Sequence, residues 1–147
     1  MNAFLIRARH LALLTGRGLL GLYFILPGVM KITGYAGTAA YMAAHEVPAI
    51  ALLLPLTIVL QIGGGLCLLL GYRPAPVAFL LAGLTLVISL YMHDFWSLPE
   101  GLERAHEMQN FIKNLAIMAG LLCISGSARP GDRVTAQAGD DGEVPAI

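Results

Sequence analysis

Four long apolar stretches, separated by short polar segments, dominate the pattern of the chain. They cover residues 11–31, 49–70, 75–93 and 111–125. A helix needs about 20 apolar residues to cross a bilayer, so the first three stretches have the length of a membrane span and the fourth is short. The connection at residues 71–75 is also short, and it predicts that the second and third helices are antiparallel neighbours.

The short fourth stretch follows a polar segment that has the features of a helix start. Ser97 and Glu100 have the spacing of a capping box, with Ser97 as the N-cap and Pro99 within the first turn. We therefore expect the last helix to begin near residue 98 and to run through a polar, partly exposed first half. Only its later turns would then enter the membrane.

The composition also indicates a membrane protein. Hydrophobic residues make up 57% of the chain and charged residues 12%, whereas soluble domains carry about 25% charge. A soluble domain of this length could not bury so much apolar surface. We predict an all-α fold, a four-transmembrane-helix bundle formed by residues 1–125 as one domain. Residues 126–147 are rich in Gly, Asp, Ala and Arg and lack aromatic side chains, so we expect a disordered cytoplasmic tail there.

Basic residues near the ends of the stretches indicate the orientation in the membrane. If the chain starts inside and crosses four times, one side holds five arginines and the other side only Arg104. The five are Arg7, Arg9, Arg73, Arg129 and Arg133. Because Arg and Lys in short loops stay cytoplasmic, we expect both termini inside and residues 32–48 and 94–110 outside. The zero net charge gives no reason to expect a nucleic acid as partner.

Three strongly polar side chains lie at the ends of three different stretches. They are Lys31, His93 and Lys113, the last followed by Asn114, and the predicted topology brings them to the same outer face. A charge near lipid costs a few kcal/mol, so such residues indicate a functional site. The alternative is that both lysines extend to the headgroups while His93 caps its helix and pairs with Asp94.

Each predicted helix also has a stripe of residues at helical spacing that we expect to face the other helices. In the first helix the spacings are four, three, four and three, and two glycines allow close packing. The stripes are Arg17, Gly21, Phe24, Gly28 and Lys31; Thr57, Gln61, Gly64 and Leu68; Ala82, Leu86, Ser89 and His93; and Lys113, Ile117, Gly120 and Ile124. Two alternatives remain open for Arg17, an extension to the cytoplasmic headgroups or a buried pair with Gln61.

In these features the chain resembles the DoxX family of small bacterial membrane proteins. The resemblance covers residues 11–125 and rests on the order and spacing of five elements. They are Arg17, Gly28-Val29-Met30-Lys31, Gly64-Gly65-Leu66 before Gly71, His93-Asp94-Phe95-Trp96, and Lys113-Asn114-Leu115. The resemblance implies a multi-pass inner-membrane protein, and some relatives are associated with quinone-linked sulfur oxidation or membrane redox complexes. Many members look to carry Glu where this chain has Gln61, which replaces an ion pair by a neutral hydrogen bond.

The resemblance suggests the membrane subunit of a quinone-linked redox system. An apolar slot would take the isoprenoid tail, while polar side chains at the outer face bind the headgroup. His93 and Lys113 are the catalytic candidates, with His93 as the proton donor because imidazole titrates near neutral pH. Binding roles are expected for Lys31, Asn114, Trp96, Arg17 and Gln61.

The sequence contains no haem, flavin or nicotinamide motif and no CxxC, so the redox centre is expected on a partner subunit within the same lipid bilayer. A homo-oligomer stays open. Two other functions also remain open. One is a membrane anchor or assembly subunit without chemistry of its own. The other is an outer-face copper or other metal site, because imidazole and thioether ligands suit Cu(I). Its candidate ligands are His45, His93, His106, Met30, Met42, Met92 and Met108.

Overall fold

The structure is a computed structural model that describes residues 3–127 as a bundle of helices. The elements are α1 (Ala3–Thr33), α2 (Tyr35–Ala44), α3 (Ile50–Leu70), α4 (Pro74–Met92), the 3-10 helix η1 (Phe95–Ser97) and α5 (Leu102–Gly126). Among the described residues, α1, α3, α4 with its extension to Ser97, and α5 are long and apolar enough to span a membrane. The predicted all-α, four-span fold is thus confirmed. The predicted tail, residues 126–147, lies outside the described residues apart from its first two.

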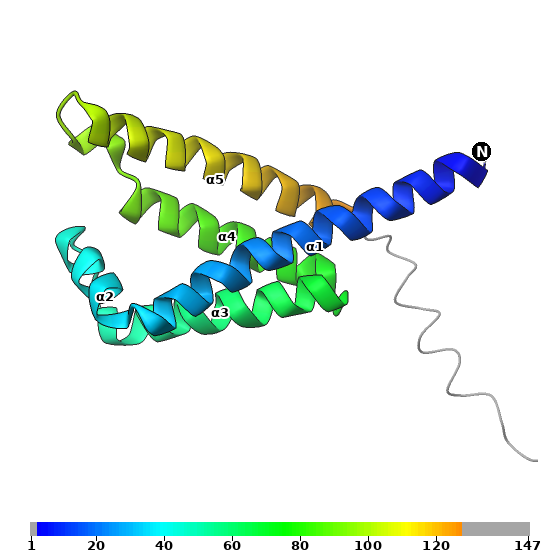
Figure 1. Cartoon of the computed structure of the whole chain (residues 1–147), viewed down its shortest axis with the longest axis horizontal. Helices are drawn as coiled ribbons and strands as arrows, with labels where there is room; N and C mark the ends of the chain where they lie inside the picture. The colour runs from blue at the N-terminus through cyan, green and yellow to red at the C-terminus, as the bar shows by residue number, and fades with distance from the viewer. Residues whose placement is uncertain (1–2, 128–147) are drawn as a thin grey trace, which may run out of the picture.

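Successive long helices run in opposite directions along the bundle (Figure 1). The closest pairs are α1 with α3 and α4 with α5, while α3 and α4 also contact one another. The prediction that the second and third spans are antiparallel neighbours is therefore confirmed. The helix α2 and the α4–α5 connection lie at one end of the bundle, here named the α2 end. The tight α3–α4 turn lies at the opposite end, here named the turn end (Figure 1).

The α1–α3 contact depends on the absence of two side chains. A Cβ built on Gly21 would lie 2.7 Å from the carbonyl oxygen of Gly65, and a Cβ on Gly65 would lie 2.7 Å from that of Gly21. Helices in lipid associate through packing and not through exclusion of water, so this close approach stabilises the pair. Gly21, Phe24 and Gly28 are buried, as the stripe in the first span predicted.

The inward face of the other spans differs in part from the prediction. In α3 the buried glycine is Gly65, one position beyond the predicted Gly64. In α4 Ser89 is buried as expected, whereas Leu86 is 40% exposed. The core of the bundle is formed by Phe24, Leu68, Ala78, Leu81, Ala82 and Leu121.

The predicted start of the last helix is wrong. The helix α5 begins at Leu102, with Gly101 in the N-cap position, and not near residue 98. The Ser97 hydroxyl is 2.8 Å from the Asp94 carbonyl oxygen and also contacts the Asp94 carboxylate, so it closes the 3-10 turn of η1. An acid three residues before Ser97 therefore competes for the hydroxyl that was expected to cap α5.

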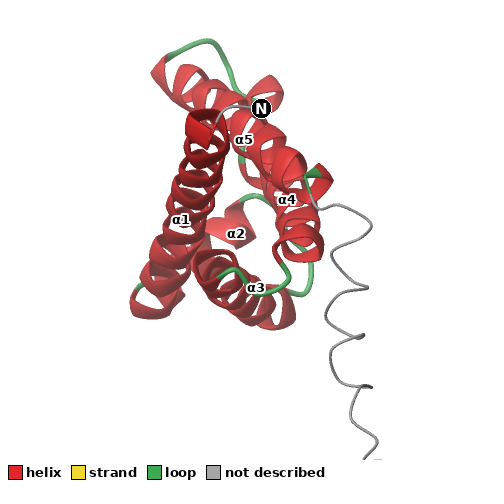
Figure 2. Cartoon of the chain, turned by 90° about the vertical axis from the view of Figure 1, so that its right-hand side faces the viewer, coloured by secondary structure: helices red, strands yellow, loops and turns green. Residues whose placement is uncertain are grey.

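The sequence reasoning also did not anticipate α2 within the outer connection at residues 32–48. Its residue Met42 is buried against the bundle. In the end-on view, α2 is seen between α1, α3 and α4, because it lies across the far end of the bundle (Figure 2). This position brings side chains of α2 beside those of the α4–α5 connection.

Candidate functional site

The α2 end contains a histidine–carboxylate pair. His93 is the C-cap residue that directly follows α4, and Glu107 lies in the second turn of α5, after the connection has reversed the chain. The His93 Nδ1 atom is 2.6 Å from the Glu107 Oε2 atom, and the two side chains are 19% and 16% exposed. An ionised carboxylate only accepts, so Nδ1 carries the proton and donates it to Glu107. The other ring nitrogen, Nε2, has no hydrogen bond to a described residue and remains free to exchange a proton with a ligand.

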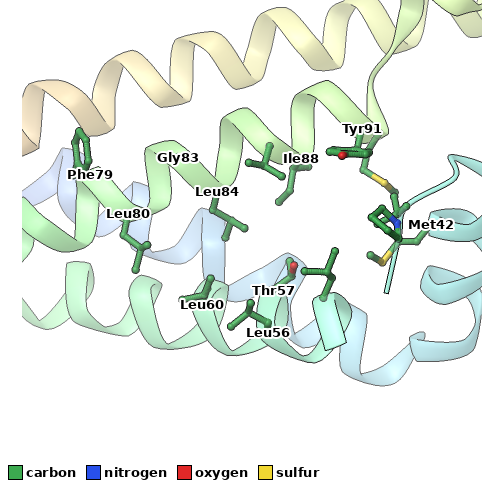
Figure 3. A pocket seen from close by; sticks show the side chains of 15 residues that line it. Met42, Leu56, Thr57, Leu60, Phe79, Leu80, Gly83, Leu84, Ile88 and Tyr91 are labelled. Carbon is green, nitrogen blue, oxygen red and sulfur yellow. The ribbon is translucent and has the colours of Figure 1, made fainter. Parts of the chain in front are cut away.

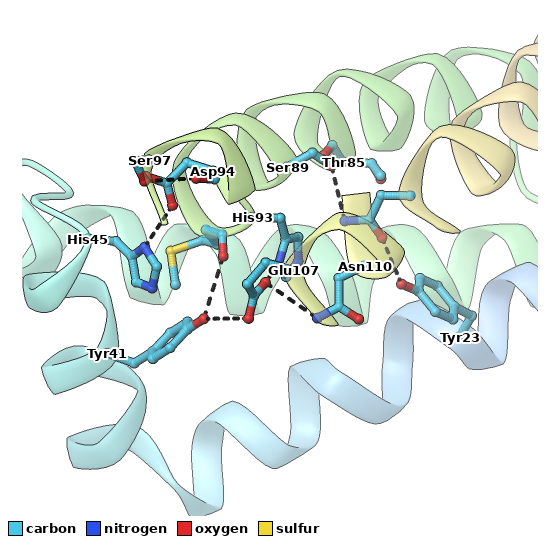
Figure 4. A network of polar contacts seen from close by, with 12 residues as sticks. Tyr23, Tyr41, His45, Thr85, Ser89, His93, Asp94, Ser97, Glu107 and Asn110 are labelled. Carbon is cyan, nitrogen blue, oxygen red and sulfur yellow. Dashed lines mark hydrogen bonds and ion pairs between the residues drawn. The ribbon is translucent and has the colours of Figure 1, made fainter. Parts of the chain in front are cut away.

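Two further side chains surround the Glu107 carboxylate (Figure 4). The Tyr41 hydroxyl from α2 lies 3.5 Å from Glu107 Oε1 and 3.5 Å from the Met92 carbonyl oxygen, so it can donate to either oxygen. The Asn110 side-chain amide donates to Glu107 Oε2 at 3.4 Å. Burial, followed by the charge of Glu107, raises the pKa of Tyr41 above its ordinary value, so this hydroxyl remains a donor at physiological pH. We name Tyr41, His93, Glu107 and Asn110 the polar cluster.

A second histidine–carboxylate contact holds α2 to the α4–α5 connection. His45 Nδ1 lies 3.3 Å from Asp94 Oδ1, and the imidazole of His45 packs on the ring of Tyr41 with 4.5 Å between centroids. The alternative in which His93 pairs with its sequence neighbour Asp94 is therefore wrong. His93 pairs with Glu107 across the connection, whereas Asp94 pairs with His45.

Polar contacts continue below the cluster along the α4–α5 contact. The buried Asn114 donates from its amide to Ser89 Oγ at 3.0 Å and accepts from the Tyr23 hydroxyl at 3.3 Å. Ser89 in turn donates to the Thr85 carbonyl oxygen at 2.7 Å. Asn114, predicted to bind substrate, thus has both ends of its amide occupied by bonds that join α1, α4 and α5. Its binding role stays a prediction.

The predicted lysines and Trp96 take no part in these hydrogen bonds. Lys113 is exposed, because its neighbour Asn114 takes the inward position on α5 and adjacent residues on a helix point about 100° apart. Lys31 is partly buried at the end of α1. Within residues 3–127 neither lysine forms a hydrogen bond or an ion pair. Trp96 is 52% exposed and packs edge-on against Phe95 and Phe111.

Arg17 and Gln61, the other two predicted residues, do not pair with each other. The Arg17 guanidinium lies against Gly71 at the turn end. Gln61 is buried opposite Gly28, and the ten residues from 61 to 71 correspond to about 15 Å along α3. Of the two alternatives left open for Arg17, the buried pair with Gln61 is therefore wrong. Arg17 is also separated from His93 by the length of α4, so the two do not share a site.

An apolar groove of about 570 Å³ runs between α3 and α4 (Figure 3). It extends from Phe79 to Met42, Tyr91 and Met92 beside the polar cluster, since Met92 directly precedes His93 and its carbonyl oxygen faces Tyr41. Apolar side chains line it, with Thr57 and Tyr91 as the exceptions. The arrangement can accept an amphipathic molecule with its tail between the helices and its polar head at the α2 end.

Sequence reasoning missed Glu107 and Tyr41 as parts of the site. A signal for Glu107 was present, because Glu107, Asn110, Asn114 and Leu121 follow one face of the last helix at spacings of three, four and seven. Tyr41 had no such signal, since it lies in a segment that was expected to be a loop.

Within residues 3–127 no three His, Cys, Asp or Glu side chains are grouped to hold a metal ion. The alternative of an outer metal site thus lacks such a ligand group there.

Comparison with known proteins identifies the family. The DoxX family model matches residues 12–94, which extend from α1 to the end of α4 and include His93. The chain belongs to the DoxX family. Two curated relatives from Escherichia coli (strain K12) are similar to it. The inner membrane protein YqjF is 39% identical over 119 residues, which are 81% of this chain and 85% of the relative. The inner membrane protein YphA is 30% identical over 118 residues, 80% of this chain and 84% of the relative.

No solved structure matches the chain. Membership of this family, together with the four apolar helices, makes the chain a multi-pass protein of the inner membrane. The family match ends at Asp94, before Glu107 in α5, so the carboxylate of the polar cluster lies outside the matched segment.

Proposed function

We propose that this DoxX-family protein is the membrane subunit of a quinone-linked redox system. The observation that carries the proposal is the apolar groove between α3 and α4, which ends beside the His93–Glu107 pair. A lipid-soluble quinone has an isoprenoid tail and a headgroup with carbonyl oxygens. The groove supplies an apolar channel for the tail, and the polar cluster supplies His93 Nε2, which donates to a carbonyl oxygen of the headgroup when the ring is protonated.

The polar cluster would act as a proton donor to the quinone. Reduction to the quinol needs two electrons and two protons, and the protons must reach the carbonyl oxygens. Glu107 holds the Nδ1–H of His93, so the neutral ring has no proton on Nε2. Nε2 would first take up a proton from water, which gives the imidazolium, and would then deliver that proton to a carbonyl oxygen of the quinone. A carboxylate beside the imidazole also stabilises the protonated ring before transfer. In this arrangement the catalytic role predicted for Lys113 is not needed, and it stays an untested prediction.

The electrons would come from a partner subunit, because the sequence has no motif for a redox centre of its own.

The proposal that the site faces outward rests on the distribution of charge. The turn end would face the cytoplasm by the positive-inside rule, because four arginines lie at this end or on the part of α1 that projects beyond it: Arg7, Arg9, Arg17 and Arg73. The α2 end with the polar cluster would then face outward. A second candidate, a membrane anchor without chemistry, is favoured by the extensive exposed apolar surface of the helices but does not explain the paired His93 and Glu107.

Two glycines allow a matched test of the groove. Gly83 lines the groove on α4, Gly63 lies on the exposed side of α3 outside it, and a Cβ on either meets nothing within 4 Å. We expect Gly83→Leu to fill part of the groove, so about 10 to 15 atom contacts of a bound tail are lost. At about 0.1 to 0.2 kcal/mol each, the loss is roughly 2 kcal/mol, or about 30-fold weaker binding. Gly63→Leu should bind as the unmodified protein does.

The measurement is photocrosslinking of the purified protein to an azido-quinone, with displacement by unlabelled ubiquinone or menaquinone. The labelled peptide should come from α3 or α4 in the unmodified protein and in Gly63→Leu. If Gly83→Leu is labelled as strongly as the unmodified protein, or if unlabelled quinone does not displace the label, the groove is not a quinone site. The anchoring function would then be the better account.

A further inference from the structure

The turn end of the bundle is uniformly positive within the part of the chain that the structure describes. Arg17 and Arg73 lie there, and Arg7 and Arg9 lie on the N-terminal part of α1, which projects beyond this end (Figure 1). All five acids among residues 3–127 instead lie in α5 or in the segments of the α2 end. These acids are Glu46, Asp94, Glu100, Glu103 and Glu107. Cations at the edge of a span without neighbouring acids attract anionic headgroups.

Arg17 is held at this end in an unusual position. A Cβ built on Gly71 would lie 2.9 Å from both terminal nitrogens of the Arg17 guanidinium, so the guanidinium lies directly against the α3–α4 turn. Gly71 makes room for it and also adopts a φ of +78°, which favours glycine. The Nε atom of Arg17 is buried and has no hydrogen-bond partner among the described residues. Arg17 as a whole is only partly buried, so an acceptor outside the protein can reach its terminal nitrogens but not Nε.

The surroundings of the guanidinium favour a phosphate group with an acyl chain attached. The helix α4 begins at the same turn, and a helix N-terminus has a partial positive charge. Arg73, in the N-cap position of α4, is exposed, and its guanidinium lies 5.9 Å from the centroid of the Tyr72 ring. Leu70, which directly precedes Gly71 in the turn, is 77% exposed and gives an apolar surface there.

We propose that Arg17 and Arg73 form a site over the α3–α4 turn for the phosphate of an anionic phospholipid. Guanidinium groups bind phosphate through two parallel hydrogen bonds, and Arg17 is restrained before the ligand arrives. The turn lies at the edge of the membrane in either orientation of the chain, so the lipid headgroup reaches it from the bilayer itself. The site is separated from the polar cluster by the length of α4 and does not depend on quinone binding.

The test measures which lipid stays with the full-length protein. The protein is placed in nanodiscs of phosphatidylcholine with or without phosphatidylglycerol, and retained lipids are counted by native mass spectrometry after release. We expect the unmodified protein to retain phosphatidylglycerol over phosphatidylcholine by about tenfold or more, as for a charge-assisted bidentate contact. Arg17→Gln should lose this preference, and Arg17→Lys should keep only part of it. Arg104→Gln, the same change at the α2 end, should retain it.

A second measurement separates the lipid from free phosphate as the ligand. Inorganic phosphate is added to nanodiscs of phosphatidylcholine alone, and the unfolding temperature is compared with that in phosphatidylglycerol. Stabilisation by phosphatidylglycerol alone supports the proposal. Stabilisation by inorganic phosphate without any lipid preference overturns the lipid as the ligand. The proposal is also wrong if the unmodified protein shows no preference for phosphatidylglycerol over phosphatidylcholine. It is equally wrong if Arg17→Gln and Arg17→Lys both retain the full preference.

Discussion

Removal of the Glu107 carboxylate tests whether the polar cluster is a site or only a contact between helices. We expect Glu107→Ala to release the Nδ1–H of His93, so the neutral imidazole changes to the tautomer that carries its proton on Nε2. Nε2 then no longer accepts a proton, and the ring is no longer oriented by α5. Glu107→Gln keeps an oxygen that can accept from Nδ1–H but lacks the charge, so it should retain the tautomer.

The size of the two effects should differ. The His93 and Glu107 side chains are 19% and 16% exposed, so water can replace the lost bonds, and the free energy of unfolding should fall by only about 1 kcal/mol. Loss of a correctly placed proton donor lowers a rate by about 10² to 10⁴, which is roughly 3 to 5 kcal/mol in the barrier. Glu107→Ala should therefore lose far more quinone-dependent activity than stability. The activity of Glu107→Gln should lie between that of Glu107→Ala and that of the unmodified protein.

The tautomer can be measured without an assay for activity. The chain has 4 histidines, and the 15N signals of the His93 ring are assigned by comparison with His93→Gln in histidine-labelled protein. A protonated Nδ1 in the unmodified protein and in Glu107→Gln, but a protonated Nε2 in Glu107→Ala, is the expected pattern. Glu103→Ala serves as the control, because Glu103 is exposed in the first turn of the same helix.

The reasoning is refuted if the Ala variant keeps its proton on Nδ1, because Glu107 would then not determine the tautomer. An unchanged activity together with a changed tautomer would instead leave the pair as a structural contact and would contradict the proposed function.

Three further predictions concern the scaffold and the orientation. Gly65→Ala should lower the amount of assembled protein in membranes, because its Cβ would lie 2.7 Å from a carbonyl oxygen of α1. Gly63→Ala should leave that amount unchanged, and immunoblots of membrane fractions compare the two variants. Asn114→Ala should lower the free energy of unfolding by about 1 kcal/mol, because the Ser89 hydroxyl then loses the amide that donates to it. Detergent titrations measure this free energy, and an unchanged value would contradict the prediction. A cysteine introduced at His45 should react with an impermeant thiol reagent in intact cells, and labelling only after permeabilisation would reverse the proposed orientation.

Much of the fold could be predicted because each span is a local property of the chain. Long apolar runs predicted four helices, and the close contact of Gly21 with α3 followed from the glycines at helical spacing. His93 was singled out because an ionisable group at the end of a span is costly to keep there. The limits of α5 were less predictable, because the Ser97 hydroxyl could either accept from a backbone N–H as an N-cap or donate to Asp94. In the folded connection it donates to the Asp94 carbonyl oxygen.

The partners of the polar residues depended on the tertiary structure. The pairing of His93 with Glu107 requires a particular axial offset between α4 and α5, and the position of Arg17 against Gly71 requires one between α1 and α3. The groove likewise exists only because α3 and α4 separate along part of their length.

The sequence by itself determined the number of spans, the helical class and the residue types at the membrane edges, because hydropathy and helical period are local properties of a segment. It did not determine the inward face of every span. In a bilayer a lipid-facing surface is as apolar as a buried one, so the pattern that identifies the core of a soluble protein is absent. Lys113 was therefore assigned to the inward face that Asn114 occupies, and only the packing of α5 against α4 distinguishes the two.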